Sequence, residues 1–137
     1  MAISVQSAVT LLQVFDMPAA IKFYCDVLGF KVVTTSETLP NGSFQWAMLQ
    51  LAGVQLMLNT AYDSNDERPA VPEAARVAAH ADTIIYFECS DVDAAYNHLL
   101  KSGVNVNPPS VAYYGMRQLY VNDPDGYELC FQKPAKS

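Results

Sequence analysis

The first apolar pattern along the chain predicts a strand followed by an amphipathic helix. Residues 8–14 alternate weakly between apolar and polar positions and lead into Phe15 and Asp16. Asp16 is a good N-cap residue, and the proline that follows suits a first helical turn, where a missing N–H does no harm. Apolar residues then recur at steps of three and four, at Met17, Ile21, Tyr24 and Leu28. We therefore expect a helix that lays one apolar stripe on a sheet and ends at Gly29.

Three further strands and an irregular segment follow this helix. The pattern predicts strands over residues 30–35, 43–51 and 54–59, separated by turn residues. Residues 60–81 break the pattern with acidic residues and prolines, although 73–79 could form a short helix. We interpret this segment as a linker between two modules.

The same order of elements then returns. Residues 83–89 predict a strand, and Asp91 predicts the N-cap of a helix that ends at Gly103; strands follow at 104–106, about 112–121 and 127–132. The caps and helix ends correspond at an offset of about seventy-five residues, which is an internal repeat. The sequence predicts one α+β domain, 1–137, made of module 1 (7–59), a linker (60–81) and module 2 (82–132).

The last two predicted strands form a hairpin, because prolines and glycines that set turn geometry cluster at residues 122–126. Strand alternation places Leu129 and Phe131 on one face and Glu128, Cys130 and Gln132 on the other. The first face is apolar, so we expect any chemistry of this hairpin on the second face.

Composition narrows the classes of function. The 137 residues are 51% hydrophobic and 16% charged, which is typical of a globular protein. A net charge of −6 argues against a nucleic-acid partner and would attract a cationic small molecule. The three cysteines show no zinc spacing, which favours free thiols in a reducing compartment. The sequence contains no apolar run long enough to span a membrane and no signal-peptide pattern, so we expect a cytoplasmic protein without a membrane partner.

The twofold repeat, with Phe23-Tyr24 before Leu28-Gly29-Phe30 and Asp123-Pro124-Asp125-Gly126 in the last hairpin, resembles the vicinal oxygen chelate superfamily of glyoxalases, bleomycin resistance proteins and extradiol dioxygenases. The resemblance covers nearly the whole chain. It implies the glyoxalase/bleomycin resistance fold, in which two βαβββ modules form an open curved sheet cup with helices on the outside. It also implies a homodimer.

The enzymes of this superfamily hold a divalent metal with four side chains. The corresponding positions in this sequence are Val9, Gln55, Ile84 and Cys130. Valine and isoleucine cannot coordinate a metal, and a thiol with a carboxamide is a poor ligand set for hard or borderline ions. We therefore expect neither a metal of the family type nor another cofactor. The extradiol pattern fails at the same place, because Cys130 occupies its glutamate position.

A second likeness concerns the run Tyr114-Gly115-Met116-Arg117 before the hairpin turn, which is similar to a run in the metal-free bleomycin resistance proteins. The match is partial, because Leu119 takes a later aromatic place. It implies a metal-independent small-molecule-binding protein that sequesters a planar or cationic compound. The alternative is a vicinal oxygen chelate enzyme, either a glyoxalase-like lyase or dioxygenase or a metal-free isomerase or lyase.

Strand parity and these resemblances together suggest contacts for a small organic ligand. The predicted ligand-binding residues are Trp46, Gln55, Tyr86, Tyr114, Arg117 and Tyr120. Three of them have a structural alternative: Trp46 could fill the core or a dimer seam, Tyr114 could pack in a dimer, and Arg117 could form an ion pair with the linker, Asp123 or Asp125.

For catalysis the candidates are Glu88, Glu128 and Cys130. The two glutamates could share one site and perturb each other's pKa, which would make one of them a candidate general base. Cys130 has no predicted basic neighbour, so a buried thiol is the alternative to a nucleophile.

Overall fold

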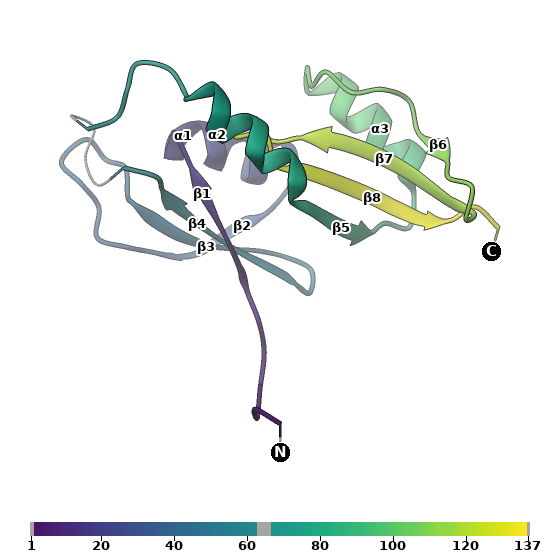
Figure 1. Cartoon of the computed structure of the whole chain (residues 1–137), viewed down its shortest axis with the longest axis horizontal. Coiled ribbons are helices and arrows are strands. Elements are labelled where there is room, and N and C mark those ends of the chain that lie inside the picture. The colour runs from purple at the N-terminus through teal and green to yellow at the C-terminus, as the bar shows by residue number, and fades with distance from the viewer. Residues whose placement is uncertain (1, 63–66, 137) are drawn as a thin grey trace. The chain divides into compact units, whose positions relative to one another are not determined.

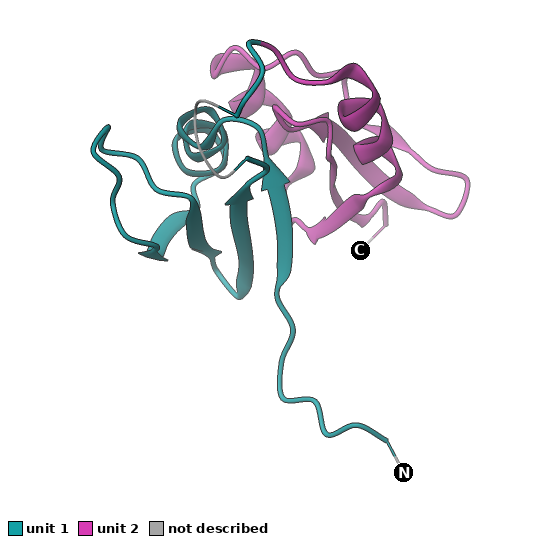
Figure 2. Cartoon of the chain, turned by 60° about the vertical axis from the view of Figure 1, so that its left-hand side comes forward, with its two compact units in different colours: residues 1–70 teal, residues 71–137 magenta. Residues whose placement is uncertain are grey.

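The chain folds into two compact units, Met1–Ala70 and Val71–Ser137 (Figure 2). The computed structural model describes residues 2–62 and 67–136 (Figure 1). The boundary between the units falls inside the predicted linker. Each unit contains an open four-stranded sheet and a helix that connects its first two strands, so the predicted α+β class with two modules is confirmed.

Unit 1 has the predicted order of strand, helix and three strands. Its elements are β1 (Thr10–Val14), α1 (Met17–Ile21), the π-helix η1 (Lys22–Val27), β2 (Lys31–Thr35), β3 (Trp46–Leu51) and β4 (Val54–Thr60). The sheet order is β1-β4-β3-β2, in which β1 and β4 run parallel and the other neighbours run antiparallel. Two parallel strands need a crossover connection between them. The helix is part of the connection from β1 to its parallel partner β4.

The first helix starts and ends where the sequence predicts, but its last part differs. The Asp16 side chain accepts a hydrogen bond from the Ala19 N–H, and Gly29 follows the helix with φ +97°. Between them the helix widens into η1, with a bond from the Leu28 N–H to the Phe23 carbonyl. Because a π-turn delays the repeat by one residue, two consecutive rings, Phe23 and Tyr24, are both buried.

The core of unit 1 lies on one face of its sheet. Side chains from three strands are buried there, and strand alternation places them together; they are Leu12, Val14, Ala47, Leu49, Leu56 and Leu58. The buried residues of α1 and η1 complete this core: Met17, Ala20, Phe23 and Tyr24.

Unit 2 repeats the arrangement after a short helical segment. Its elements are α2 (Ala74–Ala79), the 3-10 helix η2 (His80–Asp82), β5 (Ile84–Glu88), α3 (Val92–Lys101), β6 (Ser110–Val111), β7 (Met116–Asn122) and β8 (Glu128–Pro134). The sheet order is β5-β8-β7-β6, again with a parallel pair, β5 and β8. Asp91 caps α3 by accepting a hydrogen bond from the Ala94 N–H at 2.9 Å.

Two predicted strand boundaries in unit 2 are wrong. Residues 104–106 form no strand, and the strand that pairs with β7 is the two-residue β6. The two prolines at 108 and 109 lie directly before β6 and lack the N–H donors that a longer strand would need. Strand β7 begins at Met116, because a turn closed by the Gly115 N–H and the Ala112 carbonyl precedes it.

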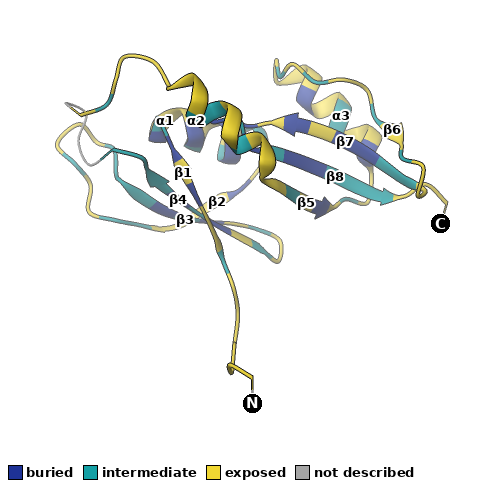
Figure 3. Cartoon of the chain, in the orientation of Figure 1, coloured by how far each residue is buried: buried dark blue, intermediate teal, exposed yellow. Residues whose placement is uncertain are grey.

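The core of unit 2 lies between its sheet and α3, which packs against β7 and β8. Leu119, Val121 and Leu129 are buried on the strands, and Val92 and Leu99 are buried on the helix. Figure 3 shows the buried segments along β7 and β8. Among the described residues, none of the helices has the length and apolar character to cross a membrane.

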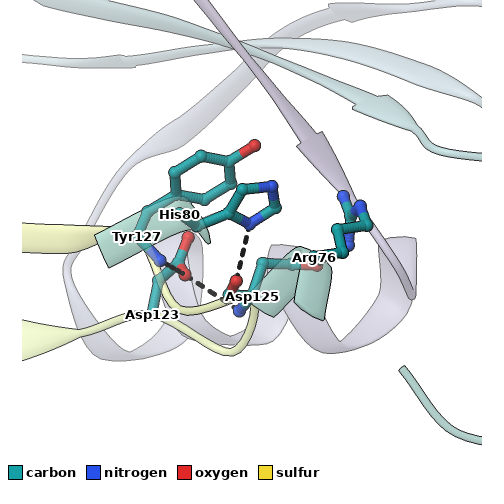
Figure 4. Close-up of polar contacts among 5 residues, drawn as sticks. All are labelled: Arg76, His80, Asp123, Asp125 and Tyr127. Carbon is teal, nitrogen blue, oxygen red and sulfur yellow. Dashed lines mark hydrogen bonds and ion pairs between the residues drawn. The ribbon is translucent and has the colours of Figure 1, made fainter. Parts of the chain in front are cut away.

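The turn between β7 and β8 is held by the helical segment that precedes β5 (Figure 4). The buried Asp123 carboxylate accepts hydrogen bonds from the N–H groups of Asp125 and Tyr127, at 2.8 and 2.9 Å. Arg76 Nη1 lies 3.2 Å from the buried Asp125 carboxylate. The His80 Nδ1 lies 2.7 Å from the Asp125 carbonyl, and its ring stacks on Tyr127. The predicted linker is therefore in part a structural element of unit 2.

Candidate ligand-binding face of unit 2

The face of the unit 2 sheet that points away from its apolar core carries polar and aromatic side chains. The strand register arranges them in rows across β5, β8 and β7. The central row is Tyr86, Cys130 and Tyr120. The rows on either side are Glu88, Gln132 and Gln118, and Ile84, Glu128 and Asn122. We call these nine residues the tyrosine face.

A chain of hydrogen bonds fixes the side chains of this face. The Tyr86 and Tyr120 hydroxyls lie 3.4 Å apart, and the Tyr120 hydroxyl donates to Gln118 Oε1 at 3.2 Å. The Gln118 Nε2 then donates to the Tyr114 hydroxyl at 2.7 Å and to Gln132 Oε1 at 2.9 Å. Gln118 is only 6% exposed. Its buried, fully bonded amide holds Tyr120 directly and Tyr86 through Tyr120.

Cys130 lies under the two tyrosines and is completely buried. This burial raises the pKa of its thiol. The hydrogen bond that Tyr120 shares with Tyr86, followed by burial, raises the pKa of Tyr120 above that of an ordinary phenol. Both groups are therefore protonated near neutral pH. A buried, protonated thiol favours the structural interpretation of Cys130 over a nucleophile.

The two glutamates lie at opposite ends of the tyrosine face. Glu88 is opposite Gln132, whereas Glu128 is opposite Ile84, so four residues of strand separate them. At the usual rise of a strand this is about 13 Å. The geometry gives no support to a pair of carboxylates that share one proton. Across the described strands β5, β7 and β8, no lysine, arginine or histidine lies on this face, so its charge is negative.

Arg117 lies on the other face of β7 from Tyr120, because neighbouring residues of a strand point in opposite directions. Its guanidinium makes a double hydrogen bond with the Asp93 carboxylate of α3, at 2.6 and 3.1 Å. This bond holds the pKa of Asp93 below its ordinary value. Arg117 thus forms an ion pair, but with α3 rather than with the linker or the hairpin turn. Asp125 is paired with Arg76 instead.

The remaining predicted contacts lie in other places. Tyr114 is exposed in the turn before β7 and touches the tyrosine face through its bond with Gln118. Trp46 and Gln55 belong to unit 1, on the sheet face away from its core, where Trp46 is half-buried and opposite Asn59. Gln55 is exposed and donates to Gln50 Oε1 at 3.3 Å.

The family's metal-ligand positions do not form a suitable donor set. Val9 and Ile84 offer only hydrocarbon, the Gln55 amide is bonded to Gln50, and the Cys130 thiol is buried and protonated. In the part of the chain that the structure describes, no group of three or more histidine, cysteine or acidic side chains is placed to hold a metal ion. The residues present therefore do not fit the metal of the related enzymes.

Sequence reasoning missed a small polar pocket of about 300 Å³ next to the tyrosine face. Tyr120, Asn122 and Glu128 contribute to it from the strands, and Asn105 and Asn107 contribute from the segment after α3. The signal was two asparagines, one inside the segment 104–106 interpreted as a strand and one directly after it. The pocket extends the tyrosine face toward Glu128.

The sequence profile of the Glyoxalase/Bleomycin resistance protein/Dioxygenase superfamily matches residues 6–131. The chain belongs to this superfamily. The resemblance inferred from its two repeats is thereby confirmed. The comparison says nothing about which of the superfamily's different activities the chain has.

Individual proteins are similar to this glyoxalase-superfamily chain over most of its length. The uncharacterized protein YaeR of Escherichia coli K12 is 32% identical over 83% of this chain and 84% of its own. The lactoylglutathione lyase of Haemophilus influenzae is 30% identical over 89% of this chain and 87% of its own. Among solved structures, TnmS3, an antibiotic binding protein from Streptomyces sp. CB03234, is 24% identical, with 98% of each chain covered and a TM-score of 0.67. This last likeness shows a common fold.

Proposed function

We propose that this protein binds a planar, cationic small molecule on the tyrosine face without the help of a metal. The observation that supports the proposal is the pair Tyr86 and Tyr120. Their side chains are 50% and 38% exposed in the middle of a sheet, and hydrogen bonds hold them in fixed positions.

The proposal rests on the chemistry of this face. Aromatic rings attract a cation placed over them by about 0.5–2 kcal/mol each, depending on how far the cation is desolvated. Glu88 and Glu128 add negative charge at the two ends of the face, and no basic side chain of the three strands opposes them. Because the tyrosines are already ordered, a ligand would lose little free energy by ordering them further.

The superfamily relationship is compatible with this proposal. The positions that hold the metal in the related enzymes are occupied here by Val9, Gln55, Ile84 and Cys130, which do not fit a metal. TnmS3, which has the same fold, is described as an antibiotic binding protein. Its fold supports a binding role by analogy only, since one fold serves many functions.

Two small probes that differ in charge test the proposal. N-methylquinolinium is planar and cationic, and quinoline is nearly the same shape and neutral at pH 7.5. We expect calorimetry to show tighter binding of N-methylquinolinium. Tyr120→Leu should weaken its binding about tenfold, since one cation–π contact is worth roughly 1.4 kcal/mol at a partly desolvated site.

Charge variants identify the site. Glu128→Gln should weaken binding of the cation while leaving binding of quinoline unchanged. Glu37→Gln, which makes the same change of charge in unit 1, is the control. Equal affinity for the two probes, or equal effects of the two glutamate variants, would show that the tyrosine face does not select a cation.

The likeness to a lactoylglutathione lyase supports a second candidate, a lyase or isomerase. Glu88 or Glu128 would be the base in a metal-free version of such a reaction. The assay is turnover of S-lactoylglutathione by the purified protein, with and without added Ni, Zn, Co, Mn and Fe ions. Turnover that a chelator abolishes would mean a metal site outside the four family positions. Turnover that survives the chelator and is lost in Glu88→Gln or Glu128→Gln would favour the metal-free enzyme.

A homodimer, a single 1–137 domain and a cytoplasmic location stay predictions of the sequence. Light scattering on the purified protein tests the first of these directly. A monomer at concentrations that saturate the probe would leave the tyrosine face of one chain as the complete site.

A further inference from the structure

Unit 1 contains a pocket of about 560 Å³ that no residue of the tyrosine face lines. Its volume lies within the usual range for small-molecule sites. The walls mix rings and aliphatic groups with a few polar side chains. The residues that carry the argument are Phe15, Asp16, Thr60, Tyr62 and Arg68.

The parallel pair of strands positions the aromatic wall. Val14 and Thr60 are the last residues of β1 and β4 and lie opposite each other, and the Ala61 N–H donates to the Val14 carbonyl at 2.8 Å. Phe15 and Tyr62 therefore leave the same edge of the sheet. Their rings meet edge to face with centroids 6.1 Å apart. This is a favourable geometry for an aromatic pair.

The opposite wall is a loop that hydrogen bonds hold in shape. Within it the Leu39 N–H donates to the Ser43 carbonyl at 2.7 Å, and the Ser43 N–H donates to Asn41 Oδ1 at 2.9 Å. The Thr60 N–H donates to the Gln45 carbonyl at 2.8 Å and ties the loop to β4. The pocket is thus formed before any ligand arrives.

Two opposite charges lie side by side at the pocket. The Arg68 guanidinium stands 5.1 Å from the centre of the Phe15 ring, and its Nη1 lies 3.8 Å from Asp16 Oδ2. This distance is too long for a hydrogen bond. The side chains are 32% and 41% exposed, and within the described residues Arg68 donates no hydrogen bond. Its N–H groups are therefore available to a ligand.

The same edge of unit 2 lacks this arrangement. Asp91 caps α3 as Asp16 caps α1, but the residue before it is Ser90, where unit 1 has Phe15. The Lys133 ammonium bonds the Ser90 carbonyl at 3.1 Å. The aromatic wall with the loosely paired Arg68 guanidinium is therefore a property of these side chains and not a consequence of the repeated fold.

We propose that this pocket binds a zwitterion with an aromatic body, of the α-amino-acid class. The ligand's carboxylate would accept hydrogen bonds from Arg68, for which the planar guanidinium is well suited. Its ammonium would face Asp16 Oδ2, since Oδ1 already accepts the bond from the Ala19 N–H. Its ring would pack against Phe15 and Tyr62. A ligand with both charges uses both members of the loose pair, whereas a single charge would leave one of them unmatched.

Three ligands of nearly equal shape test this proposal. L-phenylalanine carries both charges, 3-phenylpropanoate lacks the ammonium, and phenethylamine lacks the carboxylate. Their dissociation constants can be measured on the full chain by titration of amide NMR signals. We expect phenylalanine to bind at least tenfold more tightly than either analogue, with shifts at residues that line the pocket.

Two variants assign the charges to their partners. Asp16→Asn keeps a good N-cap residue and should abolish the preference of phenylalanine over 3-phenylpropanoate. Arg68→Gln should abolish its preference over phenethylamine. Tyr120→Leu, on the tyrosine face, should change none of the three constants, so that this test and the test of the proposed function can fail independently.

The proposal is overturned if either singly charged analogue binds as tightly as phenylalanine to the wild-type protein, or if none of the three shifts the signals of the pocket. This criterion uses the unaltered chain and holds even if a variant fails to fold.

Discussion

Gly126, in the turn between β7 and β8, provides a sharp test of how α2 and the turn fit together. Its φ is +87°, and a Cβ atom there would lie 2.5 Å from the Val77 carbonyl oxygen and 2.8 Å from Val77 Cγ1. Gly115 has nearly the same φ, +88°, but a Cβ there would meet nothing within 4 Å. The two glycines share a backbone conformation and differ in their surroundings. Replacing each by alanine separates the two effects.

The magnitudes follow from this difference. A left-handed conformation costs a residue with a Cβ about 1–2 kcal/mol, and we expect Gly115→Ala to cost no more than that. In Gly126→Ala the added atom meets backbone, so α2 must move away from the turn. That movement would break the bond between Arg76 and Asp125 and the bond between His80 and the Asp125 carbonyl. With about 1–3 kcal/mol for each of the two lost bonds, added to the cost of the left-handed backbone, Gly126→Ala should cost about 3–8 kcal/mol.

Urea unfolding followed by circular dichroism measures both free energies, and hydrogen exchange of the α2 amides shows whether that helix has been released. Arg76→Gln measures the energetic coupling between the Arg76–Asp125 bond and Gly126. It should destabilise the wild-type protein clearly and the Gly126→Ala protein very little, because the Arg76–Asp125 bond is already broken there. Equal costs of the two glycine variants, or an additive effect of Arg76→Gln, would show that α2 does not press on the turn as the structure has it.

Three further predictions concern titrating groups. Because the pKa of Tyr120 is raised in the folded state, its stabilisation is fully present below the ordinary phenol pKa of about 10 and is lost as pH rises through the folded pKa; Tyr120→Phe should flatten the alkaline fall of the melting temperature, and Tyr113→Phe should not. Because the pKa of Asp93 is lowered by its bond with Arg117, its stabilisation is present above the ordinary value of about 3.9 and is lost as pH falls through the folded pKa, so Arg117→Ala should lower the melting temperature at pH 7 and flatten its fall at acid pH. Cys130 should resist iodoacetamide at pH 8 in the folded protein and react in urea, as peptide mass spectrometry would show, because its thiol is buried and its pKa is raised.

The elements that sequence predicted best are those set by local chemistry. The Asp16 and Asp91 side chains cap their helices by accepting a hydrogen bond from the N–H group three residues further along the chain. Gly29 and Gly103 follow the helices with positive φ. These signals need no knowledge of the rest of the fold. They also revealed the repeat, and through it the superfamily.

Boundaries that depend on distant partners were harder to predict. The π-helix η1 lets two neighbouring rings, Phe23 and Tyr24, both be buried, which a regular helical stripe does not provide for. The segment 104–106 has strand-forming valines, but the strand that pairs with β7 lies beyond the prolines, at Ser110–Val111. The role of α2 depends on its contact with a turn about fifty residues away.

For the site, strand parity was the more reliable guide. Alternation grouped Tyr86 with Cys130, and the resemblance to extradiol enzymes added Gln118 and Tyr120; the register places all four in adjacent rows. The same alternation puts Arg117 on the opposite face from Tyr120, and it was the resemblance to a bleomycin resistance run that made Arg117 a predicted contact. The hydrogen bonds that fix the tyrosines require the register between strands far apart in sequence, which parity does not supply.

The repeat also explains why the two units offer different chemistry. Both use the same backbone devices, an N-capping aspartate after the first strand and a parallel pairing between the first strand and the last. What differs is the side chains at equivalent places, such as Phe15 in one unit and Ser90 in the other. Residues that follow the repeat therefore build the scaffold, whereas residues that depart from it build the sites. By this criterion the tyrosines of unit 2 and the Phe15–Arg68 pocket of unit 1 are two different proposed sites, and we expect a variant in one to leave ligand binding at the other unchanged.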